Sequence, residues 1–466
     1  MEKNRETVNI YKENLEDQVE DYIAKQRESE EGNDIRYRTC SWYKTAALLG
    51  TEYICLAAMS FPSSYVALGI IPALLVSLFA CGITIYSSLV LWEFCLRHPH
   101  IKDMCDAGQL IFGNKRWGWY FTCVMFIINN TFVQGTHVLT GAQYLNTVSD
   151  HALCTVVFTV IIVIVSFIFA LPRTFSSLSW TAMFAASTML IAIFLGIIFA
   201  AVEDYPGDYD SSVPITWSLW PQKDTTFVDA MNGVLNIIFL FAGQATFPSF
   251  IAEMKDPREF PKAIYVTFTM ASIVYALSGA IMYVYIGKDY IVSPALGSLN
   301  TLYTKISFSF TVPTIIILGV LYSSVTSRFI FFRLFSGTKH LTTHTWIGWL
   351  SWSGIVLTTW VLAFIVAESI PIFNDLIALM SALFSCWFGF LFWGIAYFQM
   401  RTQDFGPGWW KTQTAYGYLK IILNVTLIGI GLFMLGPGTY ATVMSIILHF
   451  QHDSIGAVFT CADNSL

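Results

Sequence analysis

Charged residues are scarce in this sequence of 466 residues. Only 12% are Asp, Glu, Lys or Arg, whereas 55% are hydrophobic. A soluble protein carries roughly twice this charged fraction, so the composition excludes an ordinary soluble fold. The apolar residues form long continuous runs. This pattern is typical of membrane-spanning helices and disfavours a membrane β-barrel, whose strands read as short alternating segments.

Signatures of enzymatic chemistry are also missing. The nine cysteines show no metal-ligand spacing. We find no nucleophile–base pair and no phosphate-binding loop. We therefore expect no enzymatic activity, no metal and no cofactor. The net charge of −6 comes mostly from an acidic N-terminal stretch and one acidic loop, and it gives no reason to expect nucleic acid as a partner.

Eleven apolar runs are long enough to cross a bilayer, since a helix needs about 20 apolar residues to span its hydrocarbon core. The runs cover residues 45–68, 70–96, 118–148, 152–171, 180–202, 227–251, 263–287, 301–332, 346–368, 371–399 and 417–447. The predicted fold class is therefore an all-α polytopic membrane protein with eleven transmembrane helices.

The distribution of Lys and Arg predicts the orientation of these helices, because cytosolic loops carry an excess of both residues. If the N-terminus is cytosolic, all but three of the 25 Lys and Arg residues lie on the cytosolic side. The exceptions are Lys223, Lys288 and Lys305. We predict an N-in, C-out topology with three parts: a cytosolic tail over 1–40, a transmembrane domain over 41–450 and an extracellular or luminal tail over 451–466.

The two tails carry few further signals. The first 40 residues lack the apolar segment of a signal peptide, so we expect them to stay in the cytosol. We favour a solvated regulatory tail over a docking amphipathic helix, although apolar residues recur there at helical spacing. These are Val8, Tyr11, Leu15, Val19 and Tyr22. On the predicted outer side, the placement of Cys154 and Cys461 allows a disulfide, but we favour free thiols.

Two near-identical motifs interrupt the first and sixth apolar runs. Residues 60–63 read Ser-Phe-Pro-Ser and residues 246–249 read Thr-Phe-Pro-Ser. Proline is disfavoured inside a helix but accommodated in its first turn. Five spans separate the motifs, so the two segments cross the membrane in opposite directions. The spacing predicts a five-plus-five inverted repeat in which helices one and six are discontinuous, as in many secondary transporters. Coincidence in a chain rich in Phe and Ser is the alternative.

Unwound backbone at this depth is tolerated only where it lines a buried or wet cavity. Its N–H groups suit a carboxylate and its carbonyls suit an ammonium group or a cation, so one amino acid zwitterion would satisfy both. Neighbouring amide, aromatic and hydroxyl side chains can line the same cavity or join helices. The candidate substrate-binding residues are Ala57, Ala58, Met59, Ser60, Phe61, Asn130, Gln134, Phe241, Ala242, Gly243, Gln244 and Tyr322.

Ionisable residues inside the predicted spans are the candidates for ion coupling. An intramembrane carboxylate costs about 2.5–3.5 kcal/mol on insertion scales and faces the interior. Glu52, just before the first motif, is a candidate proton carrier or gate anchor, and His137 is the histidine deepest in a span. Ser323 and Ser324 can supply oxygen ligands to a cation such as sodium.

Several segments carry a family resemblance. These are TEYICLAAMSFPSSYVALGIIP (51–72), DAGQLIFG (106–113), QGTHVLTGAQYLNT (134–147), NIIFLFAGQATFPSFIAEMKDPREFPKAI (236–264), SPALGS (293–298) and SSVTSRFIFFRLF (323–335). Over about residues 35–450 the chain resembles the amino acid/auxin permease family of the amino acid–polyamine–organocation superfamily, and within it the fungal neutral amino acid permeases.

The resemblance implies the inverted-repeat fold with one extra helix and proton-coupled uptake of amino acids. Two positions depart from the family pattern. Ala57 stands where relatives often have Gly, and Gln244 stands where they often have His. Gln cannot titrate, so proton coupling would rest on Glu52 or His137.

The function predicted is symport of protons with neutral, bulky aliphatic or aromatic L-amino acids across the plasma membrane by alternating access. The expected partners are the amino acid, protons and the lipid bilayer, with the protein monomeric. Alternatives are an amino-acid-sensing receptor with little transport, or a sodium-coupled or vacuolar amino acid transporter.

Overall fold

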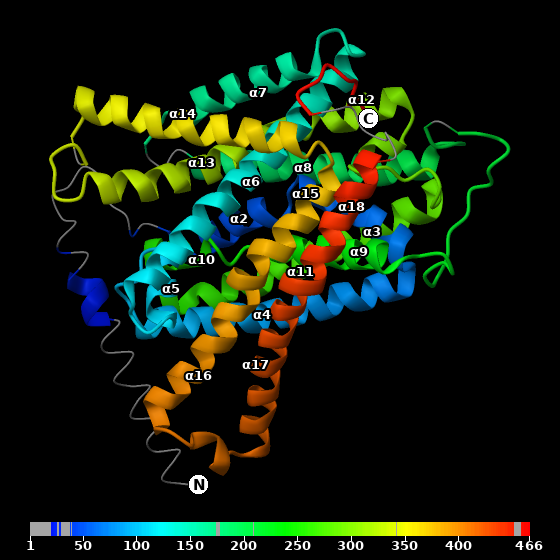
Figure 1. Cartoon of the computed structure of the whole chain (residues 1–466). Coiled ribbons are helices and arrows are strands. Elements are labelled where there is room, and N and C mark those ends of the chain that lie inside the picture. The colour runs from blue at the N-terminus through cyan, green and yellow to red at the C-terminus, as the bar shows by residue number, and fades with distance from the viewer. Residues whose placement is uncertain are drawn as a thin grey trace.

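The computed structural model describes residues 20–25, 28, 38, 40–173, 178–207, 209–341, 343–451 and 458–466. Within these residues the fold is helical throughout, with one isolated bridge between Cys40 and Met254 and no strands (Figure 1). The all-helical fold class predicted from the sequence is therefore confirmed.

The helices follow one another along the chain, and the longest connection, over residues 203–226, joins α8 to α9. Their bounds are α2 Trp42–Tyr53, η1 Leu56–Ser60, α3 Phe61–Leu68, α4 Ile70–Arg97, α5 Met104–Ile111, α6 Arg116–Ser149, α7 Thr155–Ala170, α8 Leu178–Val202, α9 Phe227–Leu240, α10 Phe247–Glu253, η2 Pro257–Glu259, α11 Phe260–Ile286, η3 Ala295–Ser298, α12 Thr301–Ser309, α13 Val312–Leu334, α14 Trp346–Ser369, α15 Phe373–Met380, η4 Ser381–Leu391, α16 Phe392–Phe405, η5 Trp409–Thr412, α17 Ala415–Phe433, η6 Met434–Gly438 and α18 Thr439–Gln451.

Seven helices in the described part of the chain are long and apolar enough to span a membrane. They cover Ile70–Arg97, Trp180–Val202, Pro257–Ile286, Val312–Leu334, Trp346–Ser369, Phe373–Phe405 and Ala415–Gln451. Shorter apolar helices cover Leu56–Leu68, Thr155–Ala170 and Phe227–Leu240. The 34-residue α6 is long enough to span but is interrupted by polar side chains. The polytopic membrane fold is thus clear, whereas the count of eleven spans stays a prediction.

Both Phe-Pro motifs mark helix interruptions. The α2 helix ends at Tyr53, and after a short 3₁₀ segment α3 begins at Phe61 with Pro62 in its first turn. The α9 helix ends at Leu240, and α10 begins at Phe247 with Pro248 in its first turn. Proline is tolerated in the first turn because the N–H it lacks would have no intrahelical partner there.

The contacts between helices fall into two groups. The α11 helix contacts α2, α3, α4 and α8, and α9 contacts α3 and α15. A second group is formed by α6 with α13 and α14. In Figure 1, α14 and α13 lie above α6, and α4 and α11 lie along the lower edge of the bundle. The segments from α15 to α18 run obliquely across the front, and the turn between α16 and α17 extends below the other helices.

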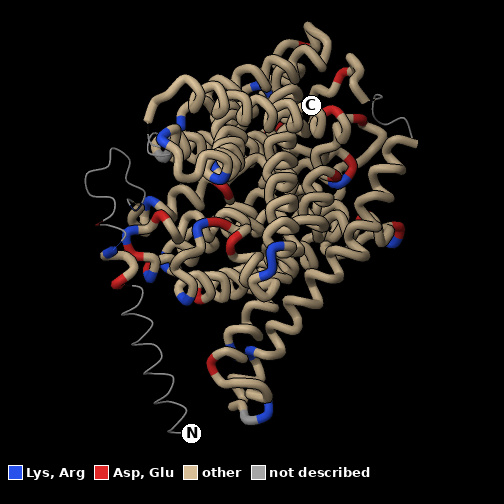
Figure 2. The backbone as a smooth tube through the Cα atoms, turned by 60° about the vertical axis from the view of Figure 1, so that its left-hand side comes forward, with Lys and Arg blue, Asp and Glu red and all other residues tan. Residues whose placement is uncertain are grey.

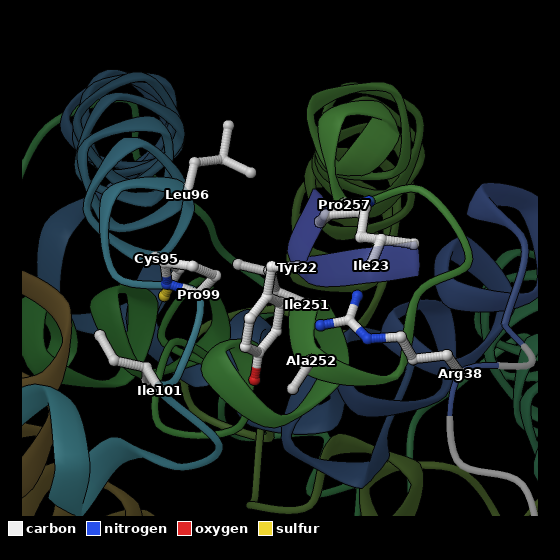
Figure 3. Close-up of a pocket in the computed structure, with 10 residues that line it drawn as sticks. All are labelled: Tyr22, Ile23, Arg38, Cys95, Leu96, Pro99, Ile101, Ile251, Ala252 and Pro257. Atoms are coloured by element: carbon white, nitrogen blue, oxygen red, sulfur yellow. The ribbon is translucent and has the colours of Figure 1, made fainter. Parts of the chain in front are cut away.

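One end of the bundle, which we call the tail side, holds the N-terminal segment and many of the charged residues (Figure 2). Tyr22 and Ile23 line a pocket there with the ends of α4 and α10 (Figure 3), and Ile23 is buried. The Arg38 guanidinium lies 5.5 Å from the Tyr22 ring centroid. The described part of the N-terminal tail therefore docks on the bundle, contrary to the favoured solvated tail. Val8, Tyr11, Leu15 and Val19 lie outside the described residues.

Ion pairs tie helices together on the tail side. The Arg97 side chain bonds to Asp404 at 2.7 Å and to Glu93 at 2.6 Å, joining α4 to α16. Arg333 on α13 bonds to Asp103 and Asp106 on α5. These carboxylates are thus held in structural pairs.

The opposite end of the bundle, which we call the disulfide side, carries the C-terminal segment. Cys154 and Cys461 are joined by a disulfide, contrary to the free thiols favoured from the sequence. The Thr155 hydroxyl donates to the Ala462 carbonyl at 2.6 Å, and the Leu466 N–H donates to the Thr147 hydroxyl at 2.9 Å. These bonds fasten the segment to the ends of α6 and α7.

Candidate functional site

Glu52 connects the two interrupted helices. It lies one residue before the end of α2 and its side chain is buried. The Thr246 hydroxyl, at the end of the second interruption, lies 3.0 Å from Glu52 Oε2. Tyr322 on α13 also interacts with this carboxyl group. The chain thus places the predicted coupling carboxylate between the broken helices and the neighbouring α13.

The second interruption packs against the end of α2. A Cβ atom at Gly243 would lie 2.7 Å from the Tyr53 hydroxyl and 3.3 Å from Glu52 Oε2. The Tyr53 hydroxyl in turn donates to the Phe241 carbonyl over 3.5 Å. A larger residue at position 243 would therefore crowd the Tyr53 and Glu52 side chains of α2.

The two motifs adopt matching local bonds. The Ser60 hydroxyl donates to the Ala57 carbonyl at 2.7 Å, and the Thr246 hydroxyl lies 3.0 Å from the Gly243 carbonyl. Ala57 and Ala58 are buried, as are Met59 and Phe61. Each motif hydroxyl thus bonds to the carbonyl three residues earlier, and the Gly243 carbonyl also accepts from the Thr246 backbone N–H at 3.2 Å.

The aromatic residues of the predicted site face α11. The Phe61 ring lies 5.5 Å from Tyr275, and the Phe241 ring lies 5.4 Å from Tyr275 and 6.2 Å from Phe268. Both phenylalanines are fully buried. The structure therefore places Phe61 and Phe241 in the packing behind the interruptions, while Tyr322 is the predicted aromatic residue that reaches Glu52.

The amides on α6 are engaged within the bundle to different degrees. The Asn130 amide donates to Thr326 Oγ1 on α13 at 3.0 Å, and its carbonyl oxygen accepts from Asn129 at 3.1 Å. Gln134 donates to the Asn130 backbone carbonyl at 3.1 Å, but its Oε1 has no hydrogen-bond partner in the described part of the chain. Asn130 therefore joins helices, and Gln134 retains a buried acceptor.

His137 and Ser323 lie in the α6–α13–α14 packing. A Cβ at Gly319 on α13 would lie 3.0 Å from Trp360 and 3.3 Å from the His137 Cβ. The Ser323 hydroxyl pairs with Thr359 on α14 at 3.0 Å, and Ser324 is buried beside it. His137 and Ser323 therefore pack near α14, whereas Glu52 contacts the second interruption and Tyr322.

Gln244 points toward other helices of the bundle. Its amide donates to the Ser87 hydroxyl on α4 at 3.3 Å. Its Oε1 has no hydrogen-bond partner among the described residues and would lie 3.5 Å from a Cβ at Gly389. Gly389 belongs to η4, a stretch of π-helix, and such stretches frequently occur at functional sites. Ala242 and Gly243 precede Gln244 in the same interruption.

Three residues of this arrangement were not singled out as site residues from the sequence. They are Thr246, Tyr53 and Tyr275, which contact Glu52 or the ends of the broken helices. Thr246 belongs to the repeated motif, so its alignment with Ser60 was a usable signal. Tyr275 lies in an apolar helix 222 positions from Tyr53, and no local pattern relates the two.

Comparison with known proteins gives the family. The family profile described as transmembrane amino acid transporter protein matches residues 38–444. The chain belongs to this family. It is 29% identical over 442 residues to the N amino acid transport system protein of Neurospora crassa, covering 94% of this chain and 92% of that protein. It is 29% identical over 441 residues to a transmembrane transporter of Gibberella moniliformis, covering 92% and 89%.

Solved structures of other transporters share the fold. A nucleobase–cation symport-1 family transporter in a closed conformation with bromovinylhydantoin bound has a TM-score of 0.53 and 14% identity, covering 89% of this chain and 93% of that one. A mutant of the Eremococcus coleocola manganese transporter has a TM-score of 0.55 and 14% identity, covering 89% and 88%. At this identity the likeness describes the arrangement of helices and not the substrate.

Proposed function

We propose that this family member is a secondary active transporter that carries neutral L-amino acids together with protons by alternating access. Membership of an amino acid transporter family supports the substrate class. The bond between Glu52 and Thr246 supports the coupling, because it places one buried carboxyl group between the two interrupted helices. In many secondary transporters such helices carry the substrate and coupling-ion sites.

The hydrogen bonds of Thr246 favour a proton as the coupling ion. Its hydroxyl oxygen lies 3.0 Å from both the Gly243 carbonyl and Glu52 Oε2. A threonine hydroxyl carries a single proton and donates fully to one acceptor. Both contacts become hydrogen bonds when Thr246 donates to Gly243 and a protonated Glu52 donates to Thr246. When Glu52 loses its proton, Thr246 donates to the carboxylate instead, and its hydroxyl bond to the Gly243 carbonyl is lost.

The sodium alternative has less support. Unwound carbonyls and half-helix ends are the usual ligands of a coupling cation. Here the Phe241 carbonyl accepts from Tyr53, and the Leu240 carbonyl accepts from Tyr275 at 3.3 Å. The Ser323 hydroxyl is paired with Thr359. The oxygens that would form a sodium site are thus used within the protein.

The inverted repeat is part of this proposal. The equivalent positions of the two motifs carry equivalent bonds, from Ser60 to Ala57 and from Thr246 to Gly243. Each motif also starts a half-helix with proline in its first turn. This agreement in geometry supports a common origin of the two halves more strongly than the residue match does.

An N-in orientation, with eleven spans and a plasma membrane location, completes the proposal. The disulfide side carries Cys154–Cys461, and disulfides persist where thiols are not kept reduced. The tail side carries Arg97, Arg333 and the N-terminal segment, in accord with the excess of Lys and Arg expected in the cytosol. Two independent signals therefore favour the same orientation.

Bulky aliphatic or aromatic side chains are the proposed substrate group. The enclosing residues are apolar or uncharged apart from Glu52, which favours a neutral substrate over a charged one. Phe61 and Phe241 pack against α11. The preference for the size of the substrate side chain is therefore assigned to Tyr322 and to the candidate residues on α6.

The direct test is uptake of a panel of labelled L-amino acids into proteoliposomes containing the purified protein. Uptake is measured with an inward proton gradient, an inward sodium gradient and no gradient. We expect a small set of neutral amino acids to accumulate with the proton gradient alone. Accumulation driven by sodium would contradict the proton assignment, and binding without accumulation under any gradient would favour an amino acid sensor.

A further inference from the structure

The side chain of Tyr275 lies behind both interrupted helices. It lies midway along α11 and is fully buried. Its hydroxyl donates to the carbonyl of Tyr53 and also lies 3.3 Å from the carbonyl of Leu240. Tyr53 is the last residue of α2, and Leu240 is the last residue of α9. One hydroxyl therefore contacts the final carbonyl of both helices.

These two carbonyls need a partner. The last four carbonyls of a helix have no intrahelical donor, and a buried carbonyl without a donor costs about 1–3 kcal/mol. Within a membrane protein no bulk water is at hand to supply that donor. The Tyr275 hydroxyl carries one proton, which it donates to the Tyr53 carbonyl, and it lies close enough to the Leu240 carbonyl to donate there instead.

The Tyr275 ring is held in place by the packing around it. It contacts Phe61 at 5.5 Å and Phe241 at 5.4 Å, one ring from each interruption. The ring therefore inserts between the two motifs, and its hydroxyl extends beyond them to the helix ends. Few rotamers are available to a side chain packed in this way.

We propose that Tyr275 is a positioning residue that fixes the ends of α2 and α9 to each other, so that the two interruptions move as one unit when the transporter changes conformation. Its hydroxyl takes the place that a bound cation would hold between the two helix ends. Removing it leaves the Tyr53 carbonyl without its donor, ends the contact with the Leu240 carbonyl and frees the interruptions to move separately.

Tyr275→Phe removes the hydroxyl and keeps the ring. Tyr283→Phe is the matched control, because Tyr283 lies two turns further along the same helix, is equally buried and bonds to Ser218 in a loop. Cys55, in the first interruption and partly exposed, serves as the reporter. The other free thiols are replaced, and alkylation of Cys55 by N-ethylmaleimide is timed on purified protein.

We expect Tyr275→Phe to raise the alkylation rate of Cys55 about fivefold, because local opening becomes easier, and Tyr283→Phe to leave it unchanged. Unchanged labelling in folded Tyr275→Phe would overturn the proposal. This measurement needs no transport, so it stands even if the proposed substrate or ion is wrong. On the proposed function, we also expect a maximal uptake rate about tenfold lower with KM within about twofold, since a conformational step is slowed.

A second substitution separates the hydroxyl from the ring. Tyr275→Gln retains a donor for a carbonyl but loses the aromatic packing. If Tyr275→Phe fails to fold while Tyr275→Gln folds and labels slowly, the requirement for a donor is upheld. If Tyr275→Phe folds and labels at the unaltered rate while Tyr275→Gln fails to fold, the residue is needed for packing alone and the proposal is wrong.

Discussion

The two interruptions begin from nearly the same four residues yet differ in structure. In the first, a 3₁₀ segment over Leu56–Ser60 follows α2 almost directly, and its small residues are buried. In the second, six residues from Phe241 to Thr246 run without a helix between α9 and α10. The first interruption is mostly apolar and contains a 3₁₀ turn, whereas the second has no helical turn and carries Gly243, Gln244 and Thr246.

The difference lies in how each motif hydroxyl is used. The Ser60 hydroxyl bonds to Ala57 within its own segment. Thr246 makes the equivalent bond to Gly243 and also meets Glu52 near the end of α2. The two motifs thus share a local bond, while the second also makes the contact with Glu52 on which the proposed function depends. The second interruption should therefore be more sensitive to substitution than the first.

The largest effect is expected from Gly243→Val. The added side chain would overlap the Tyr53 hydroxyl, which lies 2.7 Å from a Cβ at this position. We expect substrate binding to be abolished, with uptake reduced by at least about 100-fold, because displacement of the backbone misplaces the site. Ala57→Val changes the equivalent position of the first interruption. We expect it to reduce uptake about tenfold, because the larger side chain overpacks its surroundings. Binding of labelled amino acid is measured on both purified variants. An equal loss of binding in Gly243→Val and Ala57→Val would contradict the proposed difference between the two interruptions.

Glu52→Gln is expected to abolish concentrative uptake while leaving some exchange. Glutamine keeps the shape and can bond to Thr246, but it cannot carry a proton across the membrane. Accumulation and counterflow are measured in proteoliposomes with an imposed pH gradient. Glu368→Gln on α14 is the matched control, since that carboxyl is as buried as Glu52, at 8% exposure for both residues. Normal pH-driven accumulation in Glu52→Gln would exclude this residue as the proton carrier.

Removing the two motif hydroxyls compares the copies most directly. Thr246→Val deletes the bond to Glu52 as well as the bond to Gly243, whereas Ser60→Ala deletes one local bond. From the usual worth of such bonds we expect proton-driven uptake to fall about tenfold in Thr246→Val and about twofold in Ser60→Ala. The initial rate of proton-driven uptake is measured at equal expression of the two variants. A larger loss of uptake in Ser60→Ala than in Thr246→Val would contradict the expected order.

The smallest effect is expected from Gln244→His, which places the residue often found in relatives into the second interruption. A neutral histidine can still donate to Ser87, so uptake near pH 7.5 should stay within about twofold of the unaltered protein. As the pH falls through about 6.5 the imidazole gains a positive charge, which repels the substrate ammonium group. Uptake by the variant should then fall with acidification. A pH profile identical to that of the unaltered protein would show that this position does not sense the ion.

Much of the fold was predictable because the signals are local. Apolar runs, the proline positions and the change of helix at each motif follow from properties of neighbouring residues, and the structure interrupts the helices at both motifs. Predictions for single side chains were less successful. Asn130 bonds to Thr326, and Phe61 and Phe241 pack on α11, because the face of a helix that meets a cavity depends on how its neighbours are placed.

The sequence by itself determined that this is a helical membrane protein with a buried carboxylate and two related Phe-Pro motifs, since hydrophobicity and proline act over a few residues. The tertiary structure decided which polar groups meet. Thr246 reaches a carboxylate 194 positions away, and Tyr275 reaches the ends of two different helices. Such bonds form where helices cross, and in the membrane interior each polar group must find its partner there because no bulk water replaces it.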